Sequence, residues 1–559
     1  MKTAALFSIA SLLLVAGALG AGCGGSSGGY AALGVGGSNG GGGDNVAGSD
    51  GAVGDGAAGA DGGLVSGARV FGGTARLLYN GPSCTQEAGA TGDRWCAFVA
   101  FTDPVAQTRS LYVFNASRAA SGAPVSCGAG SGGADPDCLL LTADLGGDGA
   151  GLHGTFFGGD TLVYYEYQQG PLAPYVWRPG MTRGRLLATF VAGEDALYCT
   201  PAPRGTAVLC VLLPATDPDP NVSFADLLIG KADGADEPLL SVADNVVLSS
   251  AADAGFRPTF SFGFPPGSGD YVAWTTRDGA TGPETLKLQT AGDAASKTTI
   301  APDVHQWNVS PDAARWFWLS GTLGTGVGTL RTAPFPGGAN PTDVRGDVAD
   351  YDISPSDAKT VVALIKNGGL VAIADPIAAG GELVLDTPVQ ALLSIGPAGH
   401  VAYAKTRFGG NSGDLYVTKA DGTGACVVEP ARQVPFAMVN FLPGGTAILS
   451  GRASGDAYEA SYTRLRDCNT MSIAAGITLI APMGDRRVLF ADQYDDATGT
   501  ATLRIRSVGS DDTLTAAAPI PIADHVDSYS ITAATSPALV YTVNASGQSD
   551  GLYVRGFSD

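Results

Sequence analysis

The chain has 559 residues, of which 82 are Gly and 33 are Pro, and only 15% are charged. Gly and Pro at this level exclude an architecture of long helices and favour many short strands joined by turns. The net charge of −21 argues against nucleic acid as a partner, because the phosphate backbone repels an acidic body.

The first 22 residues are typical of an export signal. Lys2 is the only charged residue among them, and the apolar run over residues 4–18 is short for a membrane span. The letters from Leu19 to Cys23 resemble the lipobox of bacterial lipoproteins, in which a small residue precedes a Cys that receives a diacylglyceryl group. The resemblance implies a signal peptide over residues 1–22 and lipidation of Cys23. An ordinary signal peptide cut near Ala21 is the alternative.

A segment rich in Gly, Ser, Ala and Asp follows, over residues 23–66. It contains almost no large apolar side chains, so it cannot offset the entropy that ordering would cost, and we expect a disordered tether. Gly24, rather than Asp, follows the expected lipid anchor. By resemblance to sorted lipoproteins, this implies the outer membrane, with the folded body held away from the lipid surface.

Eight cysteines remain after Cys23, and an even number in an exported chain predicts disulfides. Local pairing is the simplest expectation, although sequence does not fix the connectivity. Metal binding is the weaker alternative, because the chain has no Cys-x-x-Cys and no His lies near these cysteines. The candidates are Cys84, Cys96, Cys127, Cys138, Cys199, Cys210, Cys426 and Cys468.

A repeat dominates the rest of the chain. Each copy has a turn such as Ser-Pro-Asp, an apolar strand, a variable loop and a second strand; residues 394–422 form the most complete copy. A unit of about 45 residues that cannot bury its own apolar face must stack on copies of itself. The turn prolines recur at intervals of 39 to 55 residues, at Pro266, Pro311, Pro355, Pro397, Pro443, Pro482 and Pro537.

These turns, followed by Leu415-Tyr416-Val417 and a closing Asp421-Gly422, resemble the β-propeller repeat of TolB-type proteins. The resemblance is good from Phe256 onward and poor before Pro238. We therefore predict an all-β chain with a single β-propeller of seven or eight four-stranded blades over residues 67–559. A larger wheel of up to ten blades, or two propellers, is the alternative.

The ring is expected to close through the start of the domain. The last unit ends after its third strand, and the strand-like run from Ala68 to Tyr79 can supply the fourth. Pairing of this run with the last blade would remove an open sheet edge.

Candidate chemistry is sparse. The four histidines, His153, His305, His400 and His525, are far apart, and we expect them at surface or edge positions. Two acidic groups allow calcium binding as a weaker alternative to solvated loops: residues 217–221, and Asp492 with Asp495 and Asp496. The tryptophans at positions 274, 316 and 318 are expected to pack between blades.

The sequence names no catalytic residue, metal site or cofactor, so we expect a binding or scaffold protein. Its partners would be the membrane, through the lipid anchor, and a protein or glycan of the cell envelope. The alternative is a propeller enzyme, such as a hydrolase, lactonase or quinone-dependent oxidoreductase, with its site at the mouth of the central channel.

Overall fold

The computed structural model describes most of residues 67–557, and the longest gaps within this range are 146–155, 188–195, 214–221 and 251–261. The predicted signal, Cys23 and tether lie outside the described residues. The described part is all-β apart from the short helix α2 (Ala116–Ala120) and the 3-10 turns η2 (Ala294–Ser296) and η3 (Phe436–Met438).

The first part of the chain forms three antiparallel sheets. The first sheet contains β2 (Ala75–Leu77), β3 (Trp95–Asp103), β4 (Thr108–Asn115) and β5 (Cys138–Thr142). The second contains β6 (Phe156–Gly158), β7 (Thr161–Tyr167), β8 (Leu172–Trp177) and β9 (Arg185–Leu186). The third contains β10 (Ala196–Pro201), β11 (Ala207–Leu213), β12 (Val222–Lys231), β13 (Leu240–Ser250), β14 (Phe262–Gly263), β15 (Tyr271–Arg277), β16 (Glu284–Thr290) and β17 (Thr298–Pro302).

Three further antiparallel sheets follow. One contains β18 (Val304–Val309), β19 (Arg315–Ser320), β20 (Gly328–Pro334), β21 (Thr342–Ile353), β22 (Val361–Ile365), β23 (Leu370–Ile373) and β24 (Glu382–Asp386). The next contains β25 (Ala391–Ile395), β26 (His400–Ala404), β27 (Ser412–Lys419) and β28 (Cys426–Pro435). The last contains β29 (Asn440–Phe441), β30 (Ala447–Ser454), β31 (Ala457–Arg464), β32 (Asn469–Pro482), β33 (Arg487–Asp495), β34 (Thr500–Ser507), β35 (Ile520–Ile531), β36 (Ala538–Val543), β37 (Gly551–Gly556) and β1 (Ala68–Gly72).

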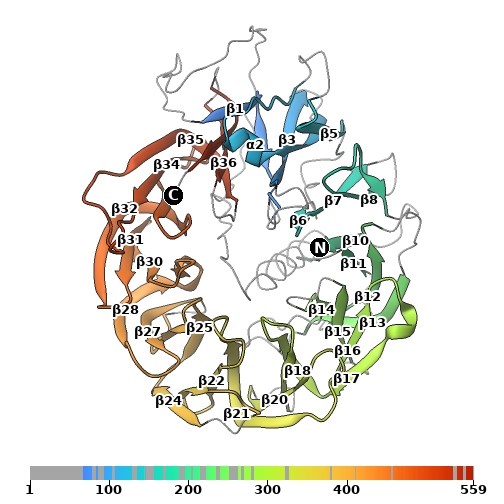
Figure 1. Cartoon of the computed structure of the whole chain (residues 1–559), viewed down its shortest axis with the longest axis vertical. Coiled ribbons are helices and arrows are strands. Elements are labelled where there is room, and N and C mark those ends of the chain that lie inside the picture. Colours follow the sequence, from blue (N-terminus) through green and yellow to red (C-terminus); the bar gives the residue numbers. More distant parts are fainter. Residues whose placement is uncertain are drawn as a thin grey trace.

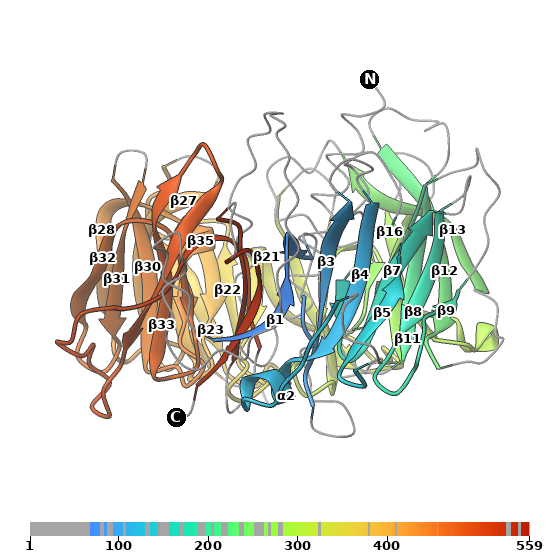
Figure 2. The same cartoon turned by 90° about the horizontal axis from the view of Figure 1, so that it is seen from above.

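The sheets follow one another around a ring, so that the first and last become neighbours (Figure 1). Their strands run mostly along the ring axis (Figure 2). The apolar cores lie between neighbouring sheets: one cluster, for example, joins Trp95 of β3 to Phe157 and Trp177 of the second sheet. This β-propeller-like arrangement buries both faces of most sheets, as stacked repeats require.

The tryptophans confirm this packing. The side chains of Trp274 and Trp316 are fully buried, and Trp318 is only 1% exposed. Trp316 contacts Trp307 and Phe335 edge to face or at a tilt, within a cluster that spans β15 to β20. The prediction of packing between sheets is therefore confirmed for Trp316 and Trp318, and Trp274 is likewise buried rather than part of an open platform.

In three long strands, the first half pairs with the preceding strand and the second half pairs with the following strand. Each of these strands therefore belongs to two successive units and links them into a larger sheet. In β21, β32 and β35, pairing passes from one neighbour to the next at Val348, Ile477 and Val526, all fully buried. The residue before each of these has a left-handed backbone, with φ values of 57° at Asp347, 71° at Gly476 and 55° at His525. These bends turn the outer strand of one unit into the inner strand of the next. We call this end of the sheets the hinge end.

The predicted Ser-Pro turns lie at the opposite end. At Ser310, the hydroxyl oxygen accepts hydrogen bonds from the backbone N–H of Ala314 (3.1 Å) and Arg315 (3.0 Å) and donates one to Asp312 (2.6 Å). Ser310 is fully buried, and Ala313 takes up the left-handed conformation that closes the turn. The Ser310 hydroxyl therefore accepts hydrogen bonds from backbone N–H groups that the sharp turn would otherwise leave without partners.

The predicted closure is confirmed for Ala68–Gly72. This strand, β1, pairs antiparallel with β37, with Ala68 opposite Val554 and Gly72 opposite Gly551. Ala75–Leu77 does not join that sheet but begins the first sheet as β2. The expected strand is thus divided, and its two halves hold the last and first sheets side by side.

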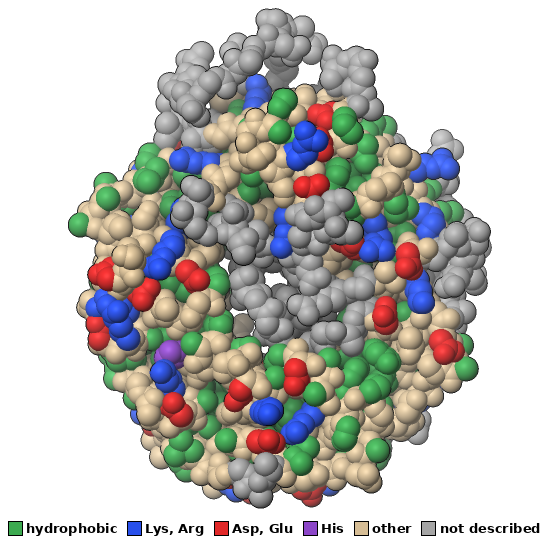
Figure 3. Space-filling view, viewed as in Figure 1, with side chains coloured by type: hydrophobic (Ala, Val, Ile, Leu, Met, Phe, Trp, Pro, Cys, Tyr) green, Lys and Arg blue, Asp and Glu red, His purple; other side chains and the backbone are tan. Residues whose placement is uncertain are grey.

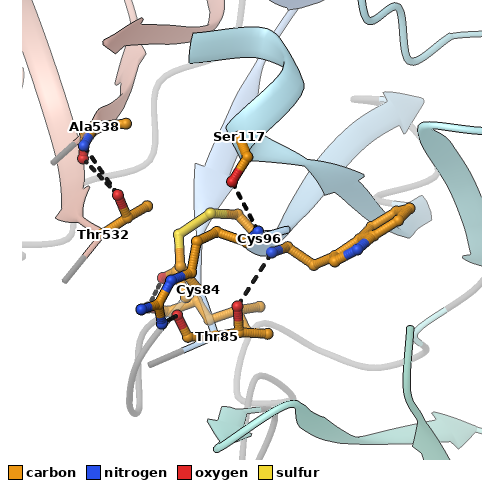
Figure 4. Close-up of a disulfide and its surroundings, with 10 residues drawn as sticks. Cys84, Thr85, Cys96, Ser117, Thr532 and Ala538 are labelled. Atoms are coloured by element: carbon orange, nitrogen blue, oxygen red, sulfur yellow. Dashed lines mark hydrogen bonds between the residues drawn. A yellow bond between two sulfur atoms is a disulfide. The ribbon is translucent and has the colours of Figure 1, made fainter. Parts of the chain in front are cut away.

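All eight predicted cysteines form disulfides, and each pairs with its local neighbour. The pairs are Cys84–Cys96, Cys127–Cys138, Cys199–Cys210 and Cys426–Cys468. Figure 4 shows Cys84–Cys96 near Ala538 of β36 and Thr532, which follows β35. Two of the four bridges therefore belong to the first sheet, next to the place where the ring closes. Disulfides indicate an oxidising, exported environment.

Candidate functional site

The histidines do not come together in a site. His305 is half-buried and His525 is exposed, both at the hinge end, whereas His153 lies outside the described residues. The expectation of a surface or edge position is wrong for His400, which begins β26 at the opposite end and is only 6% exposed. Its Nδ1 is buried without a hydrogen-bond partner among the described residues.

Neither of the two acidic groups considered for calcium binding is arranged as a metal site among the described residues. Asp492 is held by Arg504, whose Nε lies 2.9 and 2.8 Å from the two carboxylate oxygens. Asp495 accepts hydrogen bonds from the N–H of Ala497 and the hydroxyl of Thr498, both at 2.9 Å. Residues 217–221 lie outside the described residues. Across the described residues, no three His, Cys, Asp or Glu side chains are placed to hold a metal ion.

Charged side chains on the visible face of the ring are mixed rather than gathered. In Figure 3, Asp and Glu alternate with Lys and Arg around the ring. No helix among the described residues is long and apolar enough to cross a membrane. This face therefore carries no large patch of one charge that would mark a functional site.

One such cluster lies where the ring closes, at the hinge end. The first sheet contributes Arg76 from β2, together with Phe101 and Arg109, which face each other across the β3–β4 pair. The last sheet contributes Asp527 from the inner half of β35 and Thr542 from β36. The N–H of Leu77 donates to the hydroxyl of Ser528 at 3.2 Å and fixes β2 against β35. We call these five side chains, Arg76, Phe101, Arg109, Asp527 and Thr542, the seam cluster.

The carboxylate of Asp527 is already engaged within the seam cluster. Nε of Arg76 lies 3.4 Å from its Oδ2, and the Thr542 hydroxyl donates a short hydrogen bond to its Oδ1. Its side chain is only 9% exposed. Burial raises the pKa of Asp527 above its ordinary value of 3.8, and the Thr542 hydrogen bond and the Arg76 charge offset this only in part. Asp527 therefore holds the two sheets together and is poorly placed to act as a free base or nucleophile.

Two guanidinium groups lie over the ring of Phe101. The Cζ atoms of Arg109 and Arg76 are 5.6 and 5.9 Å from the ring centroid, within the range of cation–π attraction. Nε of Arg109 is buried and has no hydrogen-bond partner among the described residues. Among those residues, no carboxylate forms an ion pair with Arg109. Arg109 is thus a positioned cation whose Nε has no partner among the described residues.

The chemistry open to the seam cluster is the binding of an anion. An arginine side chain remains charged at any physiological pH and presents planar donors that match an oxyanion. No sequence motif identifies these residues, because Arg76 and Asp527 are 451 positions apart. The expected closure of the ring was the only sequence signal that could have brought them together.

A second polar group joins β24 to β26 at the hinge end. The hydroxyl of Tyr403 donates to Oδ2 of Asp386 at 2.5 Å, and Nζ of Lys405, which follows β26, lies 2.8 Å from the same oxygen. Burial alone would raise the pKa of Asp386, but hydrogen bonds from Lys405, Tyr403 and the N–H of Thr387 lower it below its ordinary value. All three groups have partners, so this arrangement stabilises the contact between two units.

Comparison with known proteins gives no family. No protein-family model matches the chain, and no curated protein matches it. Among solved structures, it is similar to a prolyl endopeptidase (15% identity, TM-score 0.35, covering 64% of this chain and 54% of that one). It is also similar to oligopeptidase B from Leishmania major (12%, 0.36, 70% and 53%) and to a eukaryotic initiation factor (11%, 0.44, 72% and 96%). The aligned region covers only about half the length of either peptidase.

Proposed function

We propose that this protein is a lipid-anchored β-propeller of the cell envelope that binds a partner and does not itself catalyse a reaction. The observation that carries the proposal is the seam cluster. Its carboxylate is engaged with Arg76 and Thr542, whereas the guanidinium of Arg109 is fixed over Phe101 and its Nε has no hydrogen-bond partner among the described residues. Such a cluster can hold a ligand, and its one hydroxyl, that of Thr542, is engaged with the buried Asp527 carboxylate that joins the two sheets.

We infer that the ring is a propeller of ten blades, the larger of the two sizes considered for a single wheel. The described part contains 37 strands, and β21, β32 and β35 each serve two units. Counting those three twice gives 40 strands, or ten groups of four. Two-dimensional class averages of the purified protein, viewed along the ring axis by electron cryomicroscopy, would count the blades directly. Seven or eight blades in those averages would overturn the inference.

We also propose that Cys23 carries the lipid and that the tether connects it to the ring. The lipobox-like letters support the anchor, and the four disulfides support export. Growth with a clickable palmitate analogue should label the wild-type protein and leave Cys23→Ser unlabelled. Gly24→Asp, which places the inner-membrane sorting residue after the anchor, should move the labelled protein from the outer to the inner membrane fraction. Equal labelling of wild type and Cys23→Ser would reject the anchor.

The binding function is tested with the full chain in its native membrane. Envelope preparations containing wild type, Arg109→Gln or Arg555→Gln would be crosslinked, and the bound partners would be compared. Arg555 is a matched control, because it and Arg487 lie over Phe557 as Arg76 and Arg109 lie over Phe101. A partner recovered with wild type and Arg555→Gln but lost with Arg109→Gln supports the proposal. A partner set that is identical in all three places the binding surface elsewhere and rejects the seam cluster as the site.

A further inference from the structure

The seam cluster has an imbalance of charge that points to the chemistry of its ligand. It contains two guanidinium groups and one carboxylate, and that carboxylate lies against Arg76. Arg109 has no ion-pair partner among the described residues, although the whole chain carries a net charge of −21. Arg109 is therefore a fixed cation whose charge is not balanced by a carboxylate among the described residues, and an anion could balance it.

The position of Arg109 restricts how such an anion can bind. Phe101 and Arg109 are opposite each other in neighbouring strands, and the aromatic ring lies beneath the guanidinium. The N–H of Leu145 donates to the carbonyl of Arg109 at 2.8 Å, which fixes the backbone at the start of β4. Its guanidinium is thus held in place before any ligand arrives, and such preorganisation favours binding.

The acidic body restricts the ligand further. A polyanion would be repelled by the net negative charge of the chain, whereas a single anionic group responds mainly to the local field of two arginines. A planar carboxylate fits the donor fork of a guanidinium in a two-pronged geometry. Beside it, the edge of Phe101 offers apolar contact to the neighbouring atoms of the ligand.

Resting on the proposed binding function, we propose that the seam cluster recognises a single carboxylate group on an otherwise uncharged ligand. Arg109 provides the principal contact, and Arg76 adds charge while it remains paired with Asp527. Two sources share this chemistry, namely the free C-terminus of a peptide and an acidic sugar. The probes that represent them are N-acetylglycine and galacturonic acid.

The test is saturation-transfer difference NMR with the full mature chain, at constant ionic strength. The probes are N-acetylglycine, its methyl ester, galacturonic acid and inorganic phosphate, measured against wild type, Arg109→Gln and Arg555→Gln. At least one probe with a free carboxylate should bind wild type and Arg555→Gln, with a saturation-transfer signal that reaches a plateau as the probe is titrated. Its affinity for Arg109→Gln should be lower by about tenfold or more, as expected for the loss of a charge-assisted hydrogen bond. Thermal melting of each variant confirms that it is folded.

The possible results distinguish a peptide ligand from a sugar ligand, and they distinguish failure of the carboxylate assignment from failure of the proposed binding function. Binding of N-acetylglycine alone identifies a peptide-like ligand, and binding of galacturonic acid alone identifies a sugar acid. Equal binding of the methyl ester, binding of phosphate only, or no binding at all would overturn the carboxylate assignment. If the carboxylate assignment fails while Arg109→Gln still loses the crosslinked partner, the proposed binding function stands and only the ligand chemistry is wrong.

Discussion

The backbone N–H of Cys127 donates a hydrogen bond to the carbonyl oxygen of Val70 at 2.8 Å. Val70 lies in the middle of β1, whose other edge pairs with β37, and Cys127 is joined by its disulfide to Cys138 at the start of β5. The closing strand is therefore held on one side by the last sheet and on the other by a segment covalently attached to the first. No open edge remains at Val70, which removes a common cause of aggregation.

The first prediction concerns this disulfide. The double variant Cys127→Ser/Cys138→Ser should lose about 2–5 kcal/mol of unfolding free energy, the usual effect of removing a native disulfide. Hydrogen exchange should show where the loss occurs, because the amides of β1 and β37 should exchange faster than in wild type. The control is Cys199→Ser/Cys210→Ser, which removes a bridge of the same sequence separation of 11 residues from the third sheet. If both double variants leave β1 and β37 equally protected, the disulfide does not secure the closure.

A second prediction concerns the close approach of β1 and β37 at Gly551. A Cβ atom built there would lie 2.4 Å from the carbonyl oxygen of Phe71, which is backbone and cannot move aside cheaply. Gly551→Ala should therefore destabilise the protein by about 1–3 kcal/mol, as overpacking typically does. Chemical denaturation followed by tryptophan fluorescence measures the change. Gly381→Ala is the control, because nothing lies within 4 Å of its Cβ position, and an unchanged midpoint for both variants would contradict the pairing.

Several elements could be predicted from the sequence because their causes are local. The turn at Ser310 follows from Pro311 and from a hydroxyl that satisfies nearby backbone donors. The pairing of Cys199 with Cys210 follows from strands that a short connection places opposite each other. The strand at Ala68–Gly72 could be predicted because the last repeat lacked one strand.

Other features depend on contacts between distant residues and had no local signal. The left-handed bends at Asp347 and His525 merge units into long shared strands, and the repeat pattern carries no signal for this merging. The seam cluster combines residues such as Phe101 and Asp527, which lie far apart in the chain but in neighbouring sheets. The blade number was also hard to predict, because the first half of the chain has no Ser-Pro turns to count.

A third prediction uses two aspartates whose pKa values are shifted in opposite directions. The pKa of Asp527 is raised in the folded state, so its contribution to stability is present below the unfolded value of 3.8 and is lost as the pH rises through the folded value. Asp386 has a lowered pKa, so its contribution is present above 3.8 and is lost as the pH falls through the folded value.

Urea denaturation across acidic to neutral pH should show these opposite signs. Relative to wild type, Asp527→Asn should gain stability as the pH rises above 3.8. Asp386→Asn should instead lose stability relative to wild type as the pH rises from more acidic values towards 3.8. Both substitutions remove a charge, keep the side-chain shape and leave one arginine or lysine without its carboxylate. Each is thus a control for the other, and slopes of the same sign would contradict the assigned environments.

The last prediction concerns the buried histidine of β26. Burial lowers the pKa of His400 below its usual 6.5, the charge of Lys419 lowers it further, and Asp421 opposes the shift. The unfolded chain therefore binds a proton near pH 6.5 that the folded protein does not accept until a lower pH, so stability should fall as the pH drops below 6.5. His400→Gln should remove this fall, as measured by urea denaturation between about pH 5 and 8. His525→Gln, at an exposed position, retains His400 and should retain the fall; a variant at His400 with the wild-type pH dependence would show that another group causes it.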